Sequence, residues 1–312
     1  MSKYVFGPVP SRRLGYSLGV DIIPGKYCCF DCIYCQIGKT TNHQIERKSF
    51  FDPYMIINEV IEKVNKSDHI DYITFSGSGE PTLNSDIGLM IDEVKRTVPI
   101  PVSVITSGAL LFQEDVRKDL LSADIILPSL DAVSEDIFRY INRPHLMVEI
   151  QSVISGLKLL RKDFRGRIWL EIMLVKDIND DEEELGKIRE VADSIHADKI
   201  QLNTVTRPPG EDIPGMLTKD ELEKACSFLG NTCEIISTFE GIPVQHEEKE
   251  WTKNVLDILK RRSLSLDDIV KVTGVSFYKA KNRLKLMENE ERIKSYHFHD
   301  TIYYILPACH ND

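Results

Sequence analysis

Short apolar runs alternate along the chain with longer stretches in which apolar residues recur every three or four positions. The short runs predict buried strands and the longer stretches predict amphipathic helices. The expected strands cover residues 18–23, 70–75, 102–105, 125–127, 168–175 and 199–205, and the expected helices cover residues 53–64, 87–94, 114–121, 134–141, 149–160 and 182–195. This alternation predicts an α/β protein with a parallel sheet covered by helices, either an open doubly wound sheet or a full or partial barrel.

The pattern changes after residue 240, and a small second domain is expected there. Residues 251–261, 265–272 and 276–289 have helical periodicity, and residues 292–305 alternate like a two-stranded ribbon. We therefore expect a main domain at 1–240, a linker at 241–250 and a small domain at 251–312.

The small domain resembles a winged helix-turn-helix, in which the second helix of the turn reads nucleic acid. That helix carries the basic residues Lys279, Lys281, Arg283 and Lys285, and Tyr278 beside them can stack on a base. Winged helices also mediate protein contacts, and basic helix residues are often only solvated. RNA or DNA contact through this helix is thus one of two interpretations.

Before the first expected strand, residues 7–15 hold several glycines and prolines and predict a turn-rich lead-in. Arg12 and Arg13 in this stretch are either solvated charges or anion holders near a site. We favour solvated charges, because the sequence shows no partner for them.

Cys28, Cys32 and Cys35 follow the first expected strand at the spacing C-x3-C-x2-C. Three thiolates on one loop can bind a soft metal centre, and they leave one position of a cubane iron-sulfur cluster without a protein ligand. A zinc site needs a fourth ligand, and only Cys29 or the distant His43 is available. A redox C-x-x-C pair leaves Cys28 unexplained, and seven cysteines are too few and odd for a disulfide framework.

This loop, with Tyr34 directly before its last cysteine, resembles the cluster loop of the radical S-adenosylmethionine (SAM) enzymes. The resemblance implies a partial six-stranded (β/α) barrel, a [4Fe-4S] cluster held by Cys28, Cys32 and Cys35, and SAM chelating the open iron. Residues 77–80 are similar to the Gly-Gly-Glu-Pro motif of that family, with Ser78 in place of the first glycine. Gly79 and Glu80 are thereby implied to hold the SAM amino group.

Further polar residues at the ends of the expected strands match the same family. The resemblance implies SAM contacts at Tyr34, Ser107, Ser129, Glu171 and Asn203. Each taken alone is more often a turn or cap residue, and their order along the chain is the argument for a site. Residues 142–145, which end in His145, are expected either to line the substrate side or to form a surface loop.

The lead-in, the cysteine loop and residues 207–209 resemble the branch that contains the tRNA wybutosine-synthesis enzymes. Those enzymes carry a second cysteine cluster before the barrel, whereas this chain has no cysteine before Cys28. Cys226, Cys233 and Cys309 are scattered, and we expect them to be small buried residues rather than a second cluster.

The function implied is a radical SAM oxidoreductase or transferase. A reduced cluster would split SAM, and the resulting 5′-deoxyadenosyl radical would abstract hydrogen from an unidentified substrate, with RNA or tRNA modification as one option. A reductant such as flavodoxin or ferredoxin is the expected partner. The alternative function is an iron-sulfur redox sensor that regulates transcription, which explains the basic helix but leaves Glu80 and the strand-end residues without a role.

Charge and hydropathy limit the other classes of function. The net charge is −10, and only residues 251–312 are basic, with 11 Lys and Arg against 8 Asp and Glu. An acidic body argues against nucleic acid wrapping the whole protein. The sequence shows no membrane-spanning apolar run and no signal segment within residues 1–20, so we expect a cytoplasmic protein, where free cysteines also persist.

Overall fold

The computed structural model describes residues 3–67, 69–207, 215–236, 248–299 and 301–307. In these residues, eight strands form one sheet in the order β1-β2-β5-β6-β7-β8-β9-β10. Every neighbouring pair is parallel except the hairpin of β1 and β2. The strands are β1 (Val5–Ser11), β2 (Gly15–Asp21), β5 (Tyr72–Ser76), β6 (Val102–Thr106), β7 (Ile125–Pro128), β8 (Arg167–Leu174), β9 (Lys199–Thr204) and β10 (Cys233–Ile235).

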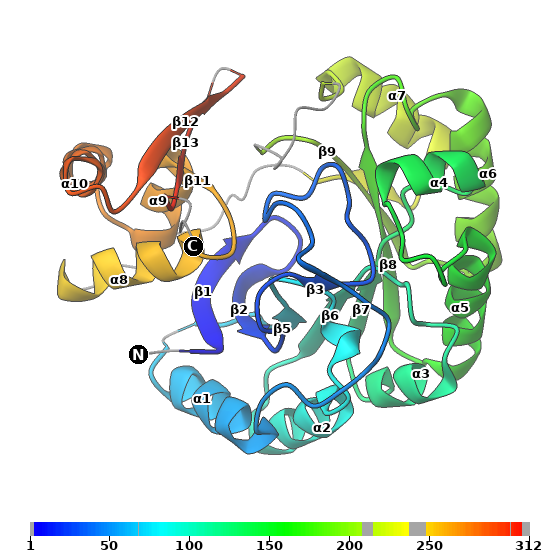
Figure 1. Ribbon diagram of the computed structural model, residues 1–312, viewed down its shortest axis with the longest axis horizontal. Coiled ribbons are helices and arrows are strands. Elements are labelled where there is room, and N and C mark those ends of the chain that lie inside the picture. Colours follow the sequence, from blue (N-terminus) through cyan, green and yellow to red (C-terminus); the bar gives the residue numbers. More distant parts are fainter. Residues whose placement is uncertain (1–2, 68, 208–214, 237–247, 300, 308–312) are drawn as a thin grey trace.

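The helices follow the strands and cover the outer face of the curved sheet (Figure 1). They are α1 (Pro53–Asn65), α2 (Ile87–Thr97), α3 (Glu114–Leu120), α4 (Glu135–Ile141), α5 (Ile150–Asp163), α6 (Glu182–Ser194) and α7 (Lys219–Leu229), with a 3-10 turn η1 (Pro81–Leu83) after β5. The expected partial barrel of parallel strands is confirmed. The strands are covered on both faces, as the fully buried Ile125 and Ile126 of β7 show, because consecutive residues of a strand point to opposite faces.

Two strands differ from the expectation. Residues 7–15 are not only a turn-rich lead-in, because β1 pairs with β2 through Val5, Phe6, Val9 and Pro10. Prolines lack a backbone N–H, and β1 tolerates them because it lies at the edge of the sheet. The short β10 adds a further parallel strand beside β9.

Residues after 247 form a second group of elements. α8 (Glu248–Leu259), α9 (Leu266–Thr273) and α10 (Phe277–Asn289) pack against a sheet of β11 (Leu264–Ser265), β13 (Thr301–Ile305) and β12 (Lys294–Phe298). Residues 241–247 of the expected linker lie outside the described residues, and residues 248–250 begin α8 instead. The order of helices and strands agrees with the expected elements, while the winged-helix assignment and the domain boundaries stay predictions.

This second group packs against the barrel through β1. Val9 of β1 belongs to the same apolar cluster as Trp251, Val255 and Ile258 of α8. Beside it, the Arg261 Nε atom donates to Asp21 Oδ2 at 3.2 Å, and the Arg261 guanidinium lies 4.5 Å from the centre of the Phe6 ring. The missed strand is therefore the element on which the C-terminal residues dock.

Among the described residues, no helix is long and apolar enough to cross a membrane.

Candidate functional site

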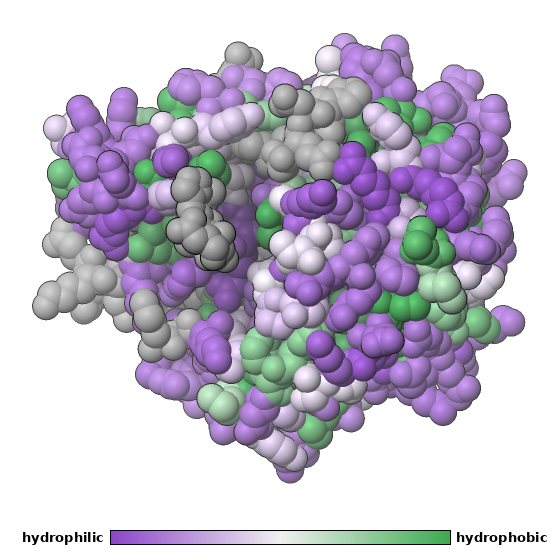
Figure 2. Space-filling model, viewed as in Figure 1, coloured by the Kyte–Doolittle hydropathy of each residue, from purple (hydrophilic) through white to green (hydrophobic). Residues whose placement is uncertain are grey.

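A cavity of about 370 Å³ opens at the carboxyl ends of the parallel strands. Parallel sheets bind ligands at this end, because the loops that follow the strands converge there. Its wall includes Tyr34, Cys35, Ser129, Asp131, Glu171 and Asn203, together with Arg12, Arg13, Arg207, Arg261 and Arg262. Figure 2 shows a recess with hydrophilic residues between the C-terminal helices and the barrel.

Cys28, Cys32 and Cys35 are partly buried, all three thiols are free, and Cys35 lines the cavity. Lys26 Nζ donates to Cys35 Sγ at 2.6 Å, and Asn142 Nδ2 donates to Cys32 Sγ at 3.5 Å. Two of the three sulfurs thus already have a hydrogen-bond donor, and such outer partners orient sulfurs that ligate metal.

The pKa values of two thiols oppose ionisation while no cation is near. Burial, and then the Glu80 carboxylate, raise the pKa of the Cys28 thiol to about 12. Burial, and then Asp131, raise the pKa of Cys32 as well. A bound cation offsets both effects, because it stabilises the thiolates directly.

Within the described residues, no three His, Cys, Asp or Glu side chains are grouped so that they could share one metal ion. Each cysteine of a cubane ligates a different iron, so its thiols do not need to meet at one point. His43, the distant candidate for a zinc ligand, has its Nε2 atom 2.9 Å from the Cys29 carbonyl oxygen.

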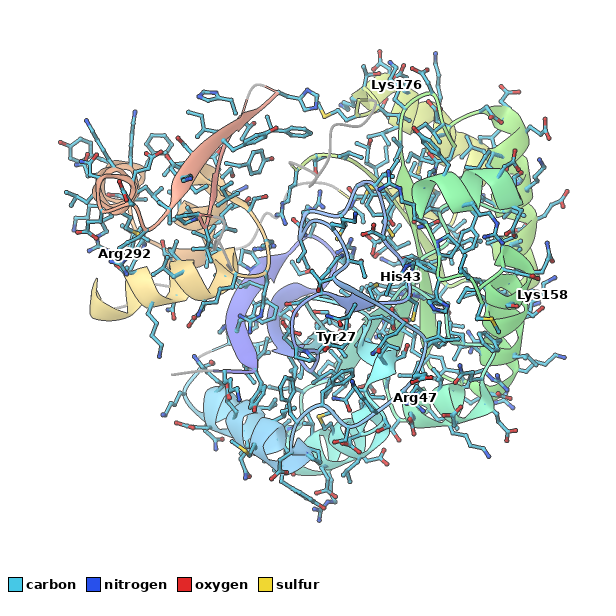
Figure 3. The ribbon with its side chains drawn as sticks, viewed as in Figure 1. Tyr27, His43, Arg47, Lys158, Lys176 and Arg292 are labelled. Carbon is cyan, nitrogen blue, oxygen red and sulfur yellow. The ribbon has the colours of Figure 1, made fainter. Side chains whose placement is uncertain are left out.

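The cysteine loop is held by backbone contacts on two sides. The strand β3 (Tyr27–Cys28) pairs with β4 (Asn42–His43), and Figure 3 shows Tyr27 and His43 lying inside the ring of helices. The amides of Asp31 and Ile33 donate to the carbonyls of Asn142 and Ile141 at 3.0 and 2.9 Å. A loop fixed in this way presents its thiols in one geometry, as preorganised metal binding requires.

Gly79 lies directly against this loop. A Cβ atom at Gly79 would lie 1.8 Å from the carbonyl oxygen of Tyr27, and the Glu80 amide donates to that same oxygen at 2.9 Å. The turn after β5 therefore needs glycine at this position because its backbone packs on the cysteine loop.

Glu80 is buried, and its carboxylate accepts hydrogen bonds from other groups of the protein. It accepts hydrogen bonds from Thr82 N at 3.0 Å, Thr106 Oγ1 at 2.6 Å and Ser107 N at 2.7 Å. Neither Glu80 nor Ser107 is among the residues that line the cavity. Glu80 ties the turn after β5 to the end of β6, and SAM contacts at Glu80 and Ser107 stay predictions.

Asp131 connects the cysteine loop to the strands. Its carboxylate accepts hydrogen bonds from Tyr34 OH at 2.5 Å, Asn142 Nδ2 at 2.7 Å and Met173 N at 2.9 Å. Burial raises the pKa of Asp131, and the bonds from Tyr34 and Asn142 work against that shift. The sequence placed Asp131 beside Ser129 but gave no sign of this bridging role.

Three of the expected SAM contacts line the cavity at the strand ends. Ser129 follows β7, and its backbone forms an isolated parallel β-bridge with Glu171 of β8. Asn203 of β9 is nearly fully buried. Glu171 forms an ion pair with Arg13 from the hairpin turn. Arg13 is thus not the solvated charge that we favoured, because folding places the hairpin over the strand ends.

Residues 142–145 lie against the cysteine loop instead of the substrate side of the cavity. The His145 amide donates to the Cys29 carbonyl at 2.8 Å, and its ring lies edge-on to His43 at 5.4 Å between centroids. These contacts support the loop from outside. Cys226 and Cys233 lie at α7 and β10, away from the cavity, and Cys309 lies outside the described residues.

Comparisons with known proteins agree with this geometry. A family model described as the radical SAM superfamily matches residues 22–187. The chain is 32% identical to the UPF0026 protein MJ1312 of Methanocaldococcus jannaschii over 96% of this chain and 95% of that protein. It is 38% identical to a protein of Brachyspira hyodysenteriae named GTPase Obg over 91% of this chain, which spans 42% of that protein's length.

Among solved structures, the chain is similar to TYW1 with a lysine-pyruvate adduct bound. The two share a TM-score of 0.53 and 20% identity over 72% of this chain and 75% of the other. At this level of identity the likeness concerns the fold.

Proposed function

Because this chain belongs to the radical SAM superfamily, whose members use a [4Fe-4S] cluster and SAM, we propose that Cys28, Cys32 and Cys35 hold the cluster and that the adjoining cavity binds SAM. When bound, these groups supply one-electron cleavage of SAM to methionine and a 5′-deoxyadenosyl radical, which takes a hydrogen atom from the substrate. The observation that carries the proposal is the position of the cysteine loop, whose Cys35 lines the cavity at the parallel strand ends.

The chain's own residues prepare this site. Lys26 and Asn142 donate hydrogen bonds to two of the sulfurs, which orients them. Asp131 fixes Tyr34, which lines the cavity. Ser129, Glu171 and Asn203 also line the cavity, and we propose that they contact the ribose and adenine parts of SAM. We propose that Gly79 and Glu80, which pack against the cysteine loop outside the cavity lining, shape the methionine end.

The test is anaerobic reconstitution with iron and sulfide, reduction with dithionite, addition of SAM, and quantification of 5′-deoxyadenosine. The wild type is expected to form it, and Cys32→Ala is expected to lose it because one iron ligand is gone. Cys226→Ala, a cysteine substitution away from the cavity, is the matched control and should retain activity. Product from Cys32→Ala at the wild-type rate would overturn the proposal.

The finer assignments are part of the same proposal. Hydrogen abstraction begins both oxidoreductase and transferase reactions, and the substrate is unidentified, with RNA or tRNA as one option. We propose flavodoxin or ferredoxin as the electron donor, because cleavage of SAM needs a one-electron reductant.

Nucleic-acid contact is supported by one specific observation on α10. Lys279, Lys281 and Lys285 are exposed and Tyr278 is 74% exposed, whereas the Arg283 guanidinium lies 5.1 Å from the centre of the Trp251 ring. If α10 binds RNA or DNA, Lys279→Ala with Lys281→Ala should weaken binding and lower its salt dependence. Nanomolar DNA binding without SAM would instead favour the transcription regulator. Unchanged nucleic-acid affinity in the double variant would exclude both RNA modification through α10 and DNA binding by a regulator.

A further inference from the structure

Five arginines of the described residues line the cavity, and one of them, Arg261, is paired with Asp21; the other four come from three separate segments. Arg12 and Arg13 lie in the turn between β1 and β2, Arg207 follows β9, and Arg262 follows α8. We call Arg12, Arg13, Arg207 and Arg262 the arginine cluster. Figure 1 shows β1 and α8 side by side, so the C-terminal residues bring Arg262 to the barrel.

Among the residues that the structure describes, only two of the four arginines in this cluster form an ion pair with a carboxylate. Arg13 pairs with Glu171, and Arg207 Nη2 lies 3.6 Å from Asp268 Oδ2. Arg12 has a neutral partner, with its Nη1 atom 3.5 Å from Thr206 Oγ1. For Arg262, the Nε and Nη2 atoms are buried and have no hydrogen-bond partner in the described part of the chain.

The uncompensated guanidiniums repel each other. Burial, and then Arg207, lower the pKa of Arg12 to about 10, while Asp268 partly opposes this. Burial and Arg207 also lower the pKa of Arg262 to about 9, and Arg12 contributes to the same shift. Burying like charges without an anion is unfavourable, and a bound anion removes the penalty.

We propose that Arg12 and Arg262 bind a phosphomonoester group of the substrate at the edge of the SAM cavity. The inference rests on the proposed function, since it assigns a substrate class to the same cavity. Arg12 and Arg262 form no ion pair among the described residues, although Asp268 acts on both, and two such guanidiniums match the two charges of a phosphomonoester at neutral pH. A carboxylate or a backbone phosphodiester carries one charge and would leave one guanidinium uncompensated.

The inference also assigns a role to the C-terminal residues. Tyr303 OH donates to the Thr206 carbonyl at 2.7 Å, so β13 fixes the segment that holds Thr206 and Arg207. The Ser265 cap and Asp268 of α9 lie beside the same arginines. The C-terminal residues therefore complete the substrate end of the cavity as well as presenting α10 to solvent.

The test is calorimetric titration of the reconstituted full chain at pH 8 with methyl phosphate, a dianionic monoester, and with dimethyl phosphate, a monoanionic diester. We expect methyl phosphate to bind and dimethyl phosphate to bind at least about tenfold more weakly. Arg262→Gln and Arg12→Gln should each weaken methyl phosphate binding about tenfold or more. Arg292→Gln, an exposed arginine of the C-terminal residues (Figure 3), should bind as the wild type does.

Three outcomes overturn the inference. The first is equal affinity of methyl phosphate for the wild type and both cavity variants, and the second is no binding of methyl phosphate by the wild type. The third is displacement of SAM by methyl phosphate, because that would assign the arginines to SAM itself. The 5′-deoxyadenosine assay is a separate measurement. Cleavage of SAM without binding of methyl phosphate would contradict only this inference. Binding of methyl phosphate without cleavage of SAM would contradict only the proposed function.

Discussion

Gly79 is a residue whose role depends on one contact. Its backbone packs on the Tyr27 carbonyl so closely that a Cβ atom would lie 1.8 Å from the oxygen and 2.8 Å from the carbonyl carbon. A backbone carbonyl in a paired segment cannot swing away as a flexible side chain would. Tyr27, directly before Cys28, is therefore positioned by the absence of a side chain at Gly79, which follows β5.

Gly79→Ala is expected to displace the cysteine loop and to reduce the rate of 5′-deoxyadenosine formation about tenfold or more, because an ångström of misplacement at a site is costly. Iron content after reconstitution should fall with it. Gly186→Ala in α6 is the control, since nothing lies within 4 Å of a Cβ there and alanine favours helix by about 1 kcal/mol. Normal iron content and rate in Gly79→Ala would show that the loop can adapt.

At the scale of elements, side-chain caps mark the start of three of the described covering helices, α1, α6 and α7. α7 begins with a capping box in which Thr218 Oγ1 accepts from Glu221 N and the Glu221 carboxylate accepts from Thr218 N at 2.7 Å. Lys176, in the loop after β8, donates to the same carboxylate at 2.8 Å. This helix start is therefore tied both to its own first turn and to a neighbouring strand end.

The hydrogen bond from Lys176, and then those from Thr218, lower the pKa of Glu221 from its ordinary value of 4.5 to about 2. Between these values the unfolded chain binds the proton and the folded chain does not, so stability falls as the pH falls through this window. The midpoint temperature of thermal unfolding should fall less between pH 6 and pH 3 in Glu221→Gln than in the wild type. Parallel curves for the two proteins would contradict this assignment.

At the scale of the whole molecule, two ion pairs of the described residues join the C-terminal residues to the barrel, Arg207 with Asp268 and the more buried Arg261 with Asp21. Arg261 and Asp21 are 12% and 7% exposed, and Asp21 also accepts a hydrogen bond from Ser78 Oγ at 2.7 Å. The turn after β5, the edge of β2 and the end of α8 thus share one carboxylate. Removing the arginine would leave that carboxylate buried beside an apolar cluster.

Arg261→Ala is expected to lower the free energy of unfolding by about 3 kcal/mol, because a buried charge loses its partner. Arg292→Ala breaks an exposed pair with Glu290 at 3.3 Å and should cost less than about 1 kcal/mol. Urea unfolding of both variants checks the difference. Equal midpoints would mean that the contact between the two parts contributes little.

The sequence alone determined the elements and indicated the chemistry of the cysteine loop. Apolar periodicity located the six parallel strands from β2 to β9, because burial on both faces leaves a local signature. The cysteine spacing and the residues after each strand pointed to the same end of the sheet. These features are short-range, so a linear pattern records them.

Only the tertiary structure decided how distant segments combine. The pattern of residues 7–15 did not predict β1, because its prolines indicate a turn. An edge strand tolerates prolines that a central strand excludes. Asp131 and Asn142 support the thiols through contacts that join residues far apart in the chain. The arginine cluster draws on three segments, from residue 12 to residue 262, and a linear pattern does not record which charges folding leaves without a partner.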